Sequence, residues 1–174
     1  MFAGFLGVPA DAADIRVADC NLNGASAAAL VSEAYQQGVS LLVLPELCLT
    51  GYTCSDLFLQ ESLLDGAGKA LLTLTEATRD KNMVVLAGLP LTVNGVLYNV
   101  AAVLHDGDIL GFVTKSYLPT YSEFYEGRDY HSGTDIEADV LFNGRTYPFG
   151  TRLLFRCRQM SHYFQKGILR ITRF

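Results

Sequence analysis

Short apolar segments alternate with segments of helical periodicity in the first half of this chain. Leu41–Leu44 and Met83–Leu89 are almost wholly apolar, as buried strands are. Apolar residues recur every three or four positions within Ala27–Tyr35 and within Leu63–Ala77, which predicts two amphipathic helices. Gly38 follows the first of them, where a left-handed residue would end the helix. The alternation predicts an α/β fold in which helices cover a sheet.

The second half of the chain is dominated by hairpin signals. Asn94-Gly95 and Asn143-Gly144 are typical two-residue turns, because both turn positions need a positive φ. Further strands are expected at residues 2–8, 15–18, 91–93, 96–104, 109–113, 140–142 and 145–147. Strand–helix–strand units give parallel neighbours and hairpins give antiparallel ones, so we expect a mixed sheet.

The size and composition of the chain exclude several protein classes. Half of its 174 residues are apolar, which excludes intrinsic disorder and suffices for a core without disulfides. The longest apolar runs fall far short of the roughly 20 residues that span a bilayer. No basic residue precedes Arg16, so the N-terminus favours a first strand over a secretory leader. We therefore expect a cytoplasmic protein without a membrane partner.

The charges are unevenly distributed. All 18 acidic residues lie at or before Asp139, whereas seven of the 13 basic residues follow it. One hypothesis is a non-catalytic interaction module whose basic end binds a polyanion or an acidic partner. The acidic remainder would repel nucleic acid, and no recognition motif is present, so we expect no nucleic-acid partner. Neither glycine-rich nucleotide-binding motif occurs.

The cysteines and histidines give no metal signature. None of them is spaced as a ligand pair: Cys20, Cys48, Cys54, Cys157, His105, His131 and His162. The spacing predicts buried free thiols and no metal site.

Two residues are placed where chemistry is expected. Glu46 follows the buried strand Leu41–Leu44 at its carboxyl end, where α/β folds bind ligands, and a carboxylate there is suited to general base catalysis. Lys115 follows the strand 109–113 in a stretch poor in other cations, where it could stabilise an oxyanion. The structural alternatives are a loop-capping carboxylate and a solvated lysine at a strand end.

Three sequence motifs occur along the chain in the same order as in a known superfamily. Pro45–Tyr52, Leu97–Asn99 and Lys115–Arg128 together resemble the nitrilase, or carbon–nitrogen hydrolase, superfamily. Within it, four more segments are similar to the glutaminase domains of glutamine-dependent NAD+ synthetases: Phe2–Phe5, Arg16–Asp19, Gly51–Asp56 and Gly88–Leu91. The likeness covers about residues 1–155.

The resemblance implies a Glu-Lys-Cys site on a four-layer αββα sandwich. Glu46 matches the family's general base, and Lys115 matches the lysine that stabilises the oxyanion. Glu123 matches a second glutamate that orients the lysine and the substrate. Tyr121 and Tyr52 match aromatic residues that line the glutamine pocket, with loop packing as the alternative. The implied reaction releases ammonia from glutamine through a cysteine thioester, for amidation of deamido-NAD+.

The resemblance also implies the partners. Glutamine is the family substrate, and the glutaminase step needs no cofactor. ATP and deamido-NAD+ belong to a synthetase domain, which we do not find in this sequence, and the full-length family implies a homo-oligomer. An amidase or carbamoylase of another nitrilase branch is the alternative enzyme.

The family's nucleophile is missing from the sequence. It stands in a Gly-x-Glu-x-Cys-Glu-Asp run that here would fall near Arg170, and no such run is present. Cys157 lies too early and has no flanking carboxylates. We therefore expect an incomplete hydrolase domain at 1–155, followed by a divergent basic tail at 156–174, with no glutamine hydrolysis by the chain alone.

The tail suggests a reading-frame change. Codons for Gly167–Arg170, read one nucleotide later, can spell Glu-x-Cys-Glu, which is the missing motif. An incomplete sandwich would expose sheet edges and apolar faces, so we expect association or poor solubility.

Overall fold

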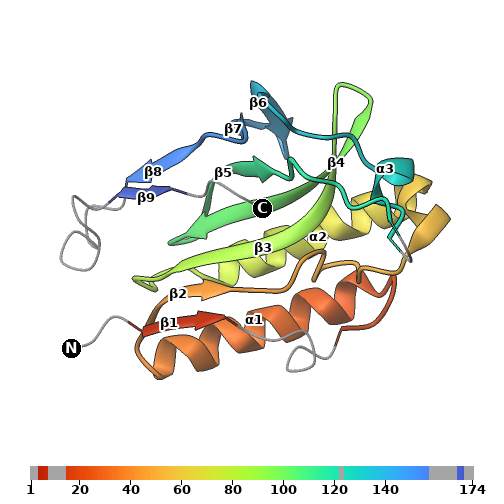
Figure 1. Ribbon diagram of the computed structural model, residues 1–174. Helices are drawn as coiled ribbons and strands as arrows, with labels where there is room; N and C mark the ends of the chain where they lie inside the picture. Colours follow the sequence, from red (N-terminus) through yellow and green to blue (C-terminus); the bar gives the residue numbers. More distant parts are fainter. Residues whose placement is uncertain (1–3, 8–14, 122–123, 157–167, 171–174) are drawn as a thin grey trace.

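The computed structural model describes residues 4–7, 15–121, 124–156 and 168–170 (Figure 1). They form a seven-stranded sheet in the order β1-β2-β3-β4-β5-β7-β6 and a two-stranded sheet, β8-β9. The elements are β1 (Gly4–Gly7), α1 (Cys20–Gln36), β2 (Val39–Val43), η1 (Ser55–Leu59), α2 (Glu61–Ala77), β3 (Val84–Val93), β4 (Val96–His105), β5 (Asp108–Thr114), α3 (Glu126–Asp129), β6 (Glu137–Phe142), β7 (Arg145–Gly150), β8 (Leu154–Arg156) and β9 (Ile168–Arg170).

The large sheet is mixed, which confirms the predicted α/β class. β1, β2 and β3 run parallel, β4 and β5 continue antiparallel, and β7 pairs with β5 in parallel. β6 and β7 form the predicted hairpin around Asn143-Gly144, and β3 and β4 form the one around Asn94-Gly95. All four of these turn residues have positive φ, as the sequence predicted.

The two long helices and one face of the sheet share the main core. Leu71 and Leu74 of α2 and Val31 of α1 are fully buried there, together with Leu42 of β2 and Phe112 of β5. The helices also approach each other closely. A Cβ atom on Gly24 of α1 would lie only 2.9 Å from Cβ of Ala70 in α2, so this crossing requires glycine.

The opposite face of the sheet carries a second, smaller cluster. It consists of Leu41, Val84, Val103, Val113 and Phe155. Successive strand residues point to opposite faces, which is why Leu41 belongs to this cluster and Leu42 to the main core. The central strands are therefore apolar on both faces, as a sheet inside a layered sandwich requires.

The predicted strand at 15–18 is wrong, because this segment is a turn. The Asn23 side chain accepts from the Arg16 N–H and donates to the Arg16 carbonyl, while Ala18 has a φ of 62° and donates to the Thr50 carbonyl. The Asp19 side chain caps α1, so the helix begins at Cys20, earlier than the apolar periodicity indicated.

Two further differences concern the extent of elements. The strands expected at 83–89 and 91–93 form one continuous strand, β3, with Pro90 inside it. Of the strand expected at 2–8, the described part is β1. Within the described residues, no helix combines the length and apolar character that a membrane crossing needs.

Candidate active site

A tight turn after β2 positions Glu46. The Leu44 N–H donates to the Leu86 carbonyl, and the Thr50 and Gly51 N–H groups return to the Leu47 carbonyl. This turn crosses directly over β3, since a Cβ atom on Gly88 would lie 2.4 Å from the Leu47 nitrogen. Glu46 is thereby held at the carboxyl end of its strand.

Lys115 directly follows β5 and is fixed through its backbone. Its N–H donates to the Asn99 carbonyl at 2.9 Å, and its carbonyl accepts from the Gly133 N–H at 2.8 Å. Its Nζ lies 2.6 Å from Oε1 of Glu46 and 2.9 Å from both carboxylate oxygens of Glu126. One ammonium group therefore sits between two carboxylates that lie 80 residues apart in the sequence.

The three charged side chains differ in burial. The Lys115 side chain is 11 % exposed and the Glu126 side chain 6 %, whereas the Glu46 side chain is 35 % exposed. Of the two carboxylates, Glu46 is the one that an incoming substrate or nucleophile can reach.

Each carboxylate has a second, neutral donor. The Tyr52 hydroxyl donates to Oε1 of Glu126 at 2.6 Å, and Nδ2 of Asn99 donates to Oε1 of Glu46 at 2.6 Å. The result is a continuous hydrogen-bonded row, Tyr52–Glu126–Lys115–Glu46–Asn99, which we call the charged row.

The electrostatics keep Lys115 protonated. Burial alone would lower the pKa of Lys115, but its hydrogen bonds and charge interactions with Glu126 and Glu46 outweigh burial and raise that pKa. Burial, followed by the hydrogen bond to Glu126, raises the pKa of Tyr52 as well. Lys115 is therefore a cationic donor suited to a developing oxyanion, and Tyr52 keeps its proton.

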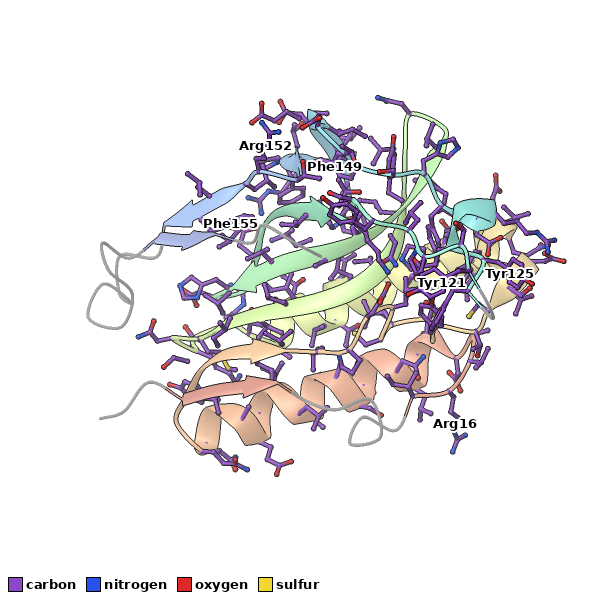
Figure 2. All side chains as sticks on the ribbon, viewed as in Figure 1. Arg16, Tyr121, Tyr125, Phe149, Arg152 and Phe155 are labelled. Carbon is purple, nitrogen blue, oxygen red and sulfur yellow. The ribbon has the colours of Figure 1, made fainter. Side chains whose placement is uncertain are left out.

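The structure brings three of the predicted site residues together and leaves Tyr121 exposed. The structure brings Glu46 and Lys115 into contact and places Tyr52 beside them, on Glu126. Tyr121 is 69 % exposed and packs edge-on against Phe124, with ring centroids 5.8 Å apart. In Figure 2, Tyr121 and Tyr125 lie together on the segment that follows β5, away from Phe155. The roles of Tyr121 and Tyr52 toward a substrate remain predictions.

Glu123 lies outside the described residues, so its role stays a prediction. Among the described residues, Glu126 contacts Lys115 in addition to Glu46. Sequence reasoning missed Glu126 because both glutamates stand in the same aromatic and acidic segment, and neither has a local signal. Asn99 was recognised as part of a motif but given no role. In both cases the deciding contact is long-range, 74 residues from Tyr52 to Glu126 and 53 from Glu46 to Asn99.

The described cysteines do not reach this site. Each thiol donates to a backbone carbonyl: Cys20 to Leu63, Cys48 to Gly88, and Cys54 to Thr50 and Gly51. Burial raises the pKa of Cys20 to about 11 and of Cys48 to about 12, and it also raises the pKa of Cys54. None of these three is a thiolate near neutral pH. Cys157 lies outside the described residues.

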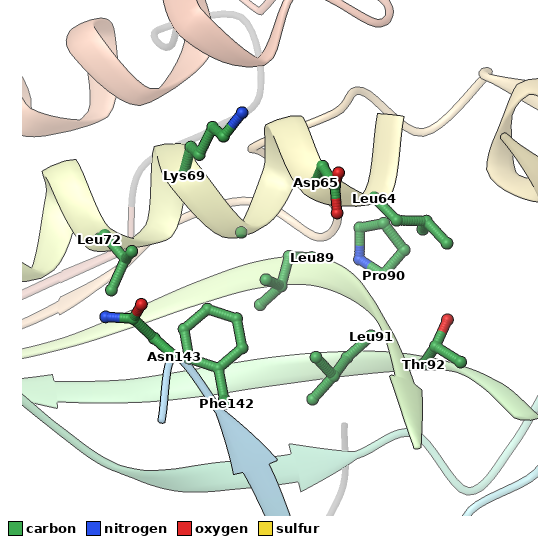
Figure 3. A pocket seen from close by; sticks show the side chains of 11 residues that line it. Leu64, Asp65, Lys69, Leu72, Leu89, Pro90, Leu91, Thr92, Phe142 and Asn143 are labelled. Atoms are coloured by element: carbon green, nitrogen blue, oxygen red, sulfur yellow. The ribbon is translucent and has the colours of Figure 1, made fainter. Parts of the chain in front are cut away.

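A cavity of about 200 Å³ adjoins the charged row. Its walls come from the turn after β2, η1 and α3: Leu47, Tyr52, Thr53, Ser55, Phe58, Tyr125, Glu126, Asp129 and Tyr130. A larger groove of about 400 Å³ lies between α2, β3 and the β6–β7 turn (Figure 3). That groove contains no member of the charged row, whereas the smaller cavity is lined by two of them, Tyr52 and Glu126.

Within the described ranges, no three histidine, cysteine, aspartate or glutamate side chains are grouped so that they could bind a metal ion. The charged row offers a cationic donor, Lys115, and the carboxylates of Glu46 and Glu126.

Comparison with known proteins decides the family. Residues 12–159 match the carbon–nitrogen hydrolase family. The chain belongs to this family. The resemblance predicted from the three motifs is thereby confirmed, as is the assignment to an enzyme family. The carbon–nitrogen hydrolase match includes every described member of the charged row.

Individual relatives indicate the branch. The chain is 41 % identical over 160 residues to the glutamine-dependent NAD(+) synthetase of Mycobacterium tuberculosis, which covers 92 % of this chain and 24 % of the relative. The crystal structure of a glutamine-dependent NAD(+) synthetase from Cytophaga hutchinsonii matches with a TM-score of 0.78 and 29 % identity, covering 84 % of this chain and 25 % of that one.

A more distant structure shares the fold alone. An amidase from Nesterenkonia matches with a TM-score of 0.58 and 23 % identity, over 77 % of this chain and 50 % of that one. The nitrilase-type fold class is thereby confirmed. The chain spans about a quarter of the length of the curated NAD(+) synthetases that it matches.

Proposed function

We propose that this chain is part of the glutamine amidohydrolase domain of a glutamine-hydrolysing NAD+ synthetase and supplies its acid–base residues. The observation that carries the proposal is the Lys115 ammonium held between Glu46 and Glu126, in a chain with 41 % identity to such an enzyme. In that reaction a cysteine thioester forms, ammonia leaves, and the ammonia amidates deamido-NAD+.

The charged row supports one division of labour. Glu46, the more exposed carboxylate, accepts the thiol proton, passes it to the leaving ammonia and later activates the water that hydrolyses the thioester. Lys115 donates to the oxyanion of each tetrahedral intermediate. Glu126 is buried and fixed by Tyr52, so it positions Lys115. Tyr52 and Tyr121 border the volume in which glutamine would bind.

The nucleophile is the group that this chain does not supply. The three described cysteines are buried, bonded to backbone carbonyls and poor thiolates. Cys157 has arginines on both sides and no adjacent carboxylate in the sequence. The chain alone is therefore inactive toward glutamine in this proposal.

We attribute residues 156–174 to translation in another frame. The sequence has no acidic residue after Asp139, and Gly167–Arg170 can be encoded by codons that spell Glu-x-Cys-Glu in the shifted frame. ATP and deamido-NAD+ would act only in a synthetase domain, and the glutaminase step would need no cofactor. The setting is cytoplasmic, and assembly is as a homo-oligomer with that domain.

The proposal is tested by reading the gene sequence in the shifted frame and by measuring glutamine hydrolysis. The chain as given and the product of the frame-restored gene are each incubated with L-glutamine, and released ammonia is measured. We expect release only from the restored product, and loss of that release in its E46Q variant. Absence of Glu-x-Cys from the shifted frame, or ammonia release by the given chain that C157S abolishes, contradicts the proposal. A restored product that hydrolyses only small amides indicates the amidase branch instead.

A further inference from the structure

We propose that Asn99 is a positioning residue that fixes the orientation of Glu46, so that Oε2 and not Oε1 of that carboxylate carries the proton. The inference rests on the proposed role of Glu46 as general base. It assigns a task to a side chain whose role the sequence did not reveal.

Asn99 is connected to both members of the catalytic pair. It lies in β4 with no exposed surface, and its carbonyl accepts from the Lys115 N–H at 2.9 Å. Its Nδ2 donates to Oε1 of Glu46 at 2.6 Å. One buried residue thus anchors the backbone of Lys115 and the side chain of Glu46, which sets the distance between them.

The two oxygens of Glu46 are in different environments. Oε1 accepts from Nδ2 of Asn99 and from Nζ of Lys115, both at 2.6 Å. Oε2 accepts from no group in the part of the chain that the structure describes, and the side chain is 35 % exposed. A proton on Oε1 would displace one of two short donors, whereas a proton on Oε2 disturbs neither. Oε2 is therefore the oxygen that receives the proton.

Only the Nδ2 half of the Asn99 side-chain amide forms a hydrogen bond with another described residue. Its Oδ1 is buried and has no hydrogen-bond partner among the described residues, so this half of the amide contributes no stabilisation. Among the described residues, the hydrogen bond that the Asn99 side chain does make is the one to Glu46. This asymmetry fits a residue whose task is to hold the carboxylate.

The test compares N99D, N99L, E46Q and N99D/E46Q by thermal unfolding of the full chain between pH 5 and pH 8. N99D places a second carboxyl against Oε1 of Glu46, so the introduced group has a raised pKa in the folded state. Stability that depends on a raised pKa is present at low pH and is lost as the pH rises. We expect the Tm of N99D relative to N99L to fall by about 5 °C from pH 5 to pH 8.

Two further variants complete the cycle. In N99D/E46Q the carboxylate partner is gone, so the Tm difference from N99L should no longer grow with pH. E46Q alone keeps an amide oxygen for both donors and places its NH2 where Oε2 was. It also removes the negative charge beside Lys115, so its Tm should fall, but by less than that of N99L. N143D, on the exposed β6–β7 turn, is the matched control and should show no dependence on E46Q.

The outcomes are decisive in both directions. An equal pH dependence in N99D and N99D/E46Q overturns the claim that Asn99 acts on Glu46. A Tm loss in E46Q as large as that in N99L overturns the assignment of Oε2. Neither measurement involves glutamine hydrolysis, so this inference can fail while the proposed function stands, and the reverse also holds.

Discussion

The two faces of the seven-stranded sheet differ in how many buried apolar residues they carry. The face toward α1 and α2 is filled by the main core, in which Leu42, Leu71 and Leu74 are fully buried. The opposite face has only a small apolar cluster around Val103 and Val113. The charged row stands at the ends of strands, since Glu46 and Lys115 follow β2 and β5 and meet Asn99 of β4 there. The helix-covered face therefore holds most of the buried core, while the chemistry lies at the strand ends.

The largest expected effect separates the two faces directly. L74A removes a fully buried side chain of α2 and should lower the free energy of unfolding by about 3–4 kcal/mol. L41A, on the smaller cluster, should cost about 2 kcal/mol, because fewer buried neighbours lose contact. Urea unfolding measures both. Equal costs would break the distinction between the faces.

A smaller effect is expected from the charge of Lys115. K115M leaves Glu46 and Glu126 facing each other without the ammonium and should cost about 2 kcal/mol, less than a fully buried pair because Glu46 is partly exposed. Urea unfolding at pH 7 measures this cost. K69M, at an exposed helix position, is the control. A K115M cost no larger than that of K69M would argue against a charged Lys115.

Loss of one neutral donor should be milder still. Y52F removes the hydroxyl that donates to Glu126 and should cost about 1–1.5 kcal/mol, as measured by chemical denaturation. Y35F is its control, since Tyr35 contacts Lys81 through its ring. If the two variants behaved alike, the Tyr52–Glu126 hydrogen bond would not contribute to stability.

The smallest effect is expected at the surface. Arg128 and Asp56 form an ion pair at 2.6 Å, the same distance as Lys115 and Glu46, but their side chains are 66 % and 70 % exposed. R128A should cost less than about 1 kcal/mol, and 0.5 M salt should remove most of that difference. A cost equal to that of K115M would show that burial does not decide the strength of these pairs.

Much of the fold could be predicted from local signals. Apolar runs, helical periodicity and Asn-Gly pairs correctly predicted β2, α2 and the two hairpins. Each of these signals depends on only a few neighbouring residues. The segment 15–18 was misassigned because its conformation is set by hydrogen bonds to Asn23 and Thr50. The pattern of apolar residues within the segment gives no sign of these contacts. The strand–turn distinction there is a tertiary effect.

The site could be predicted only in part. Glu46 and Lys115 stand at strand ends, where position and motif both indicate chemistry. Glu126 and Asn99 gain their places through contacts with Tyr52, Lys115 and Glu46 that depend on packing distant segments together. The role predicted for Glu123 stays a prediction, because that residue lies outside the described residues.

The central claim is that Lys115 is a permanently charged donor held between Glu46 and Glu126. The most direct measurement is the titration of the Lys115 13Cε chemical shift, assigned with K115R, in the full chain. The pKa of Lys115 is raised, so its contribution to stability is complete below about 10.5 and is lost as the pH rises through the higher folded-state value. We predict a midpoint above 10.5 that falls in both E46Q and E126Q. A midpoint at or below 10.5, unchanged in both variants, would contradict the account.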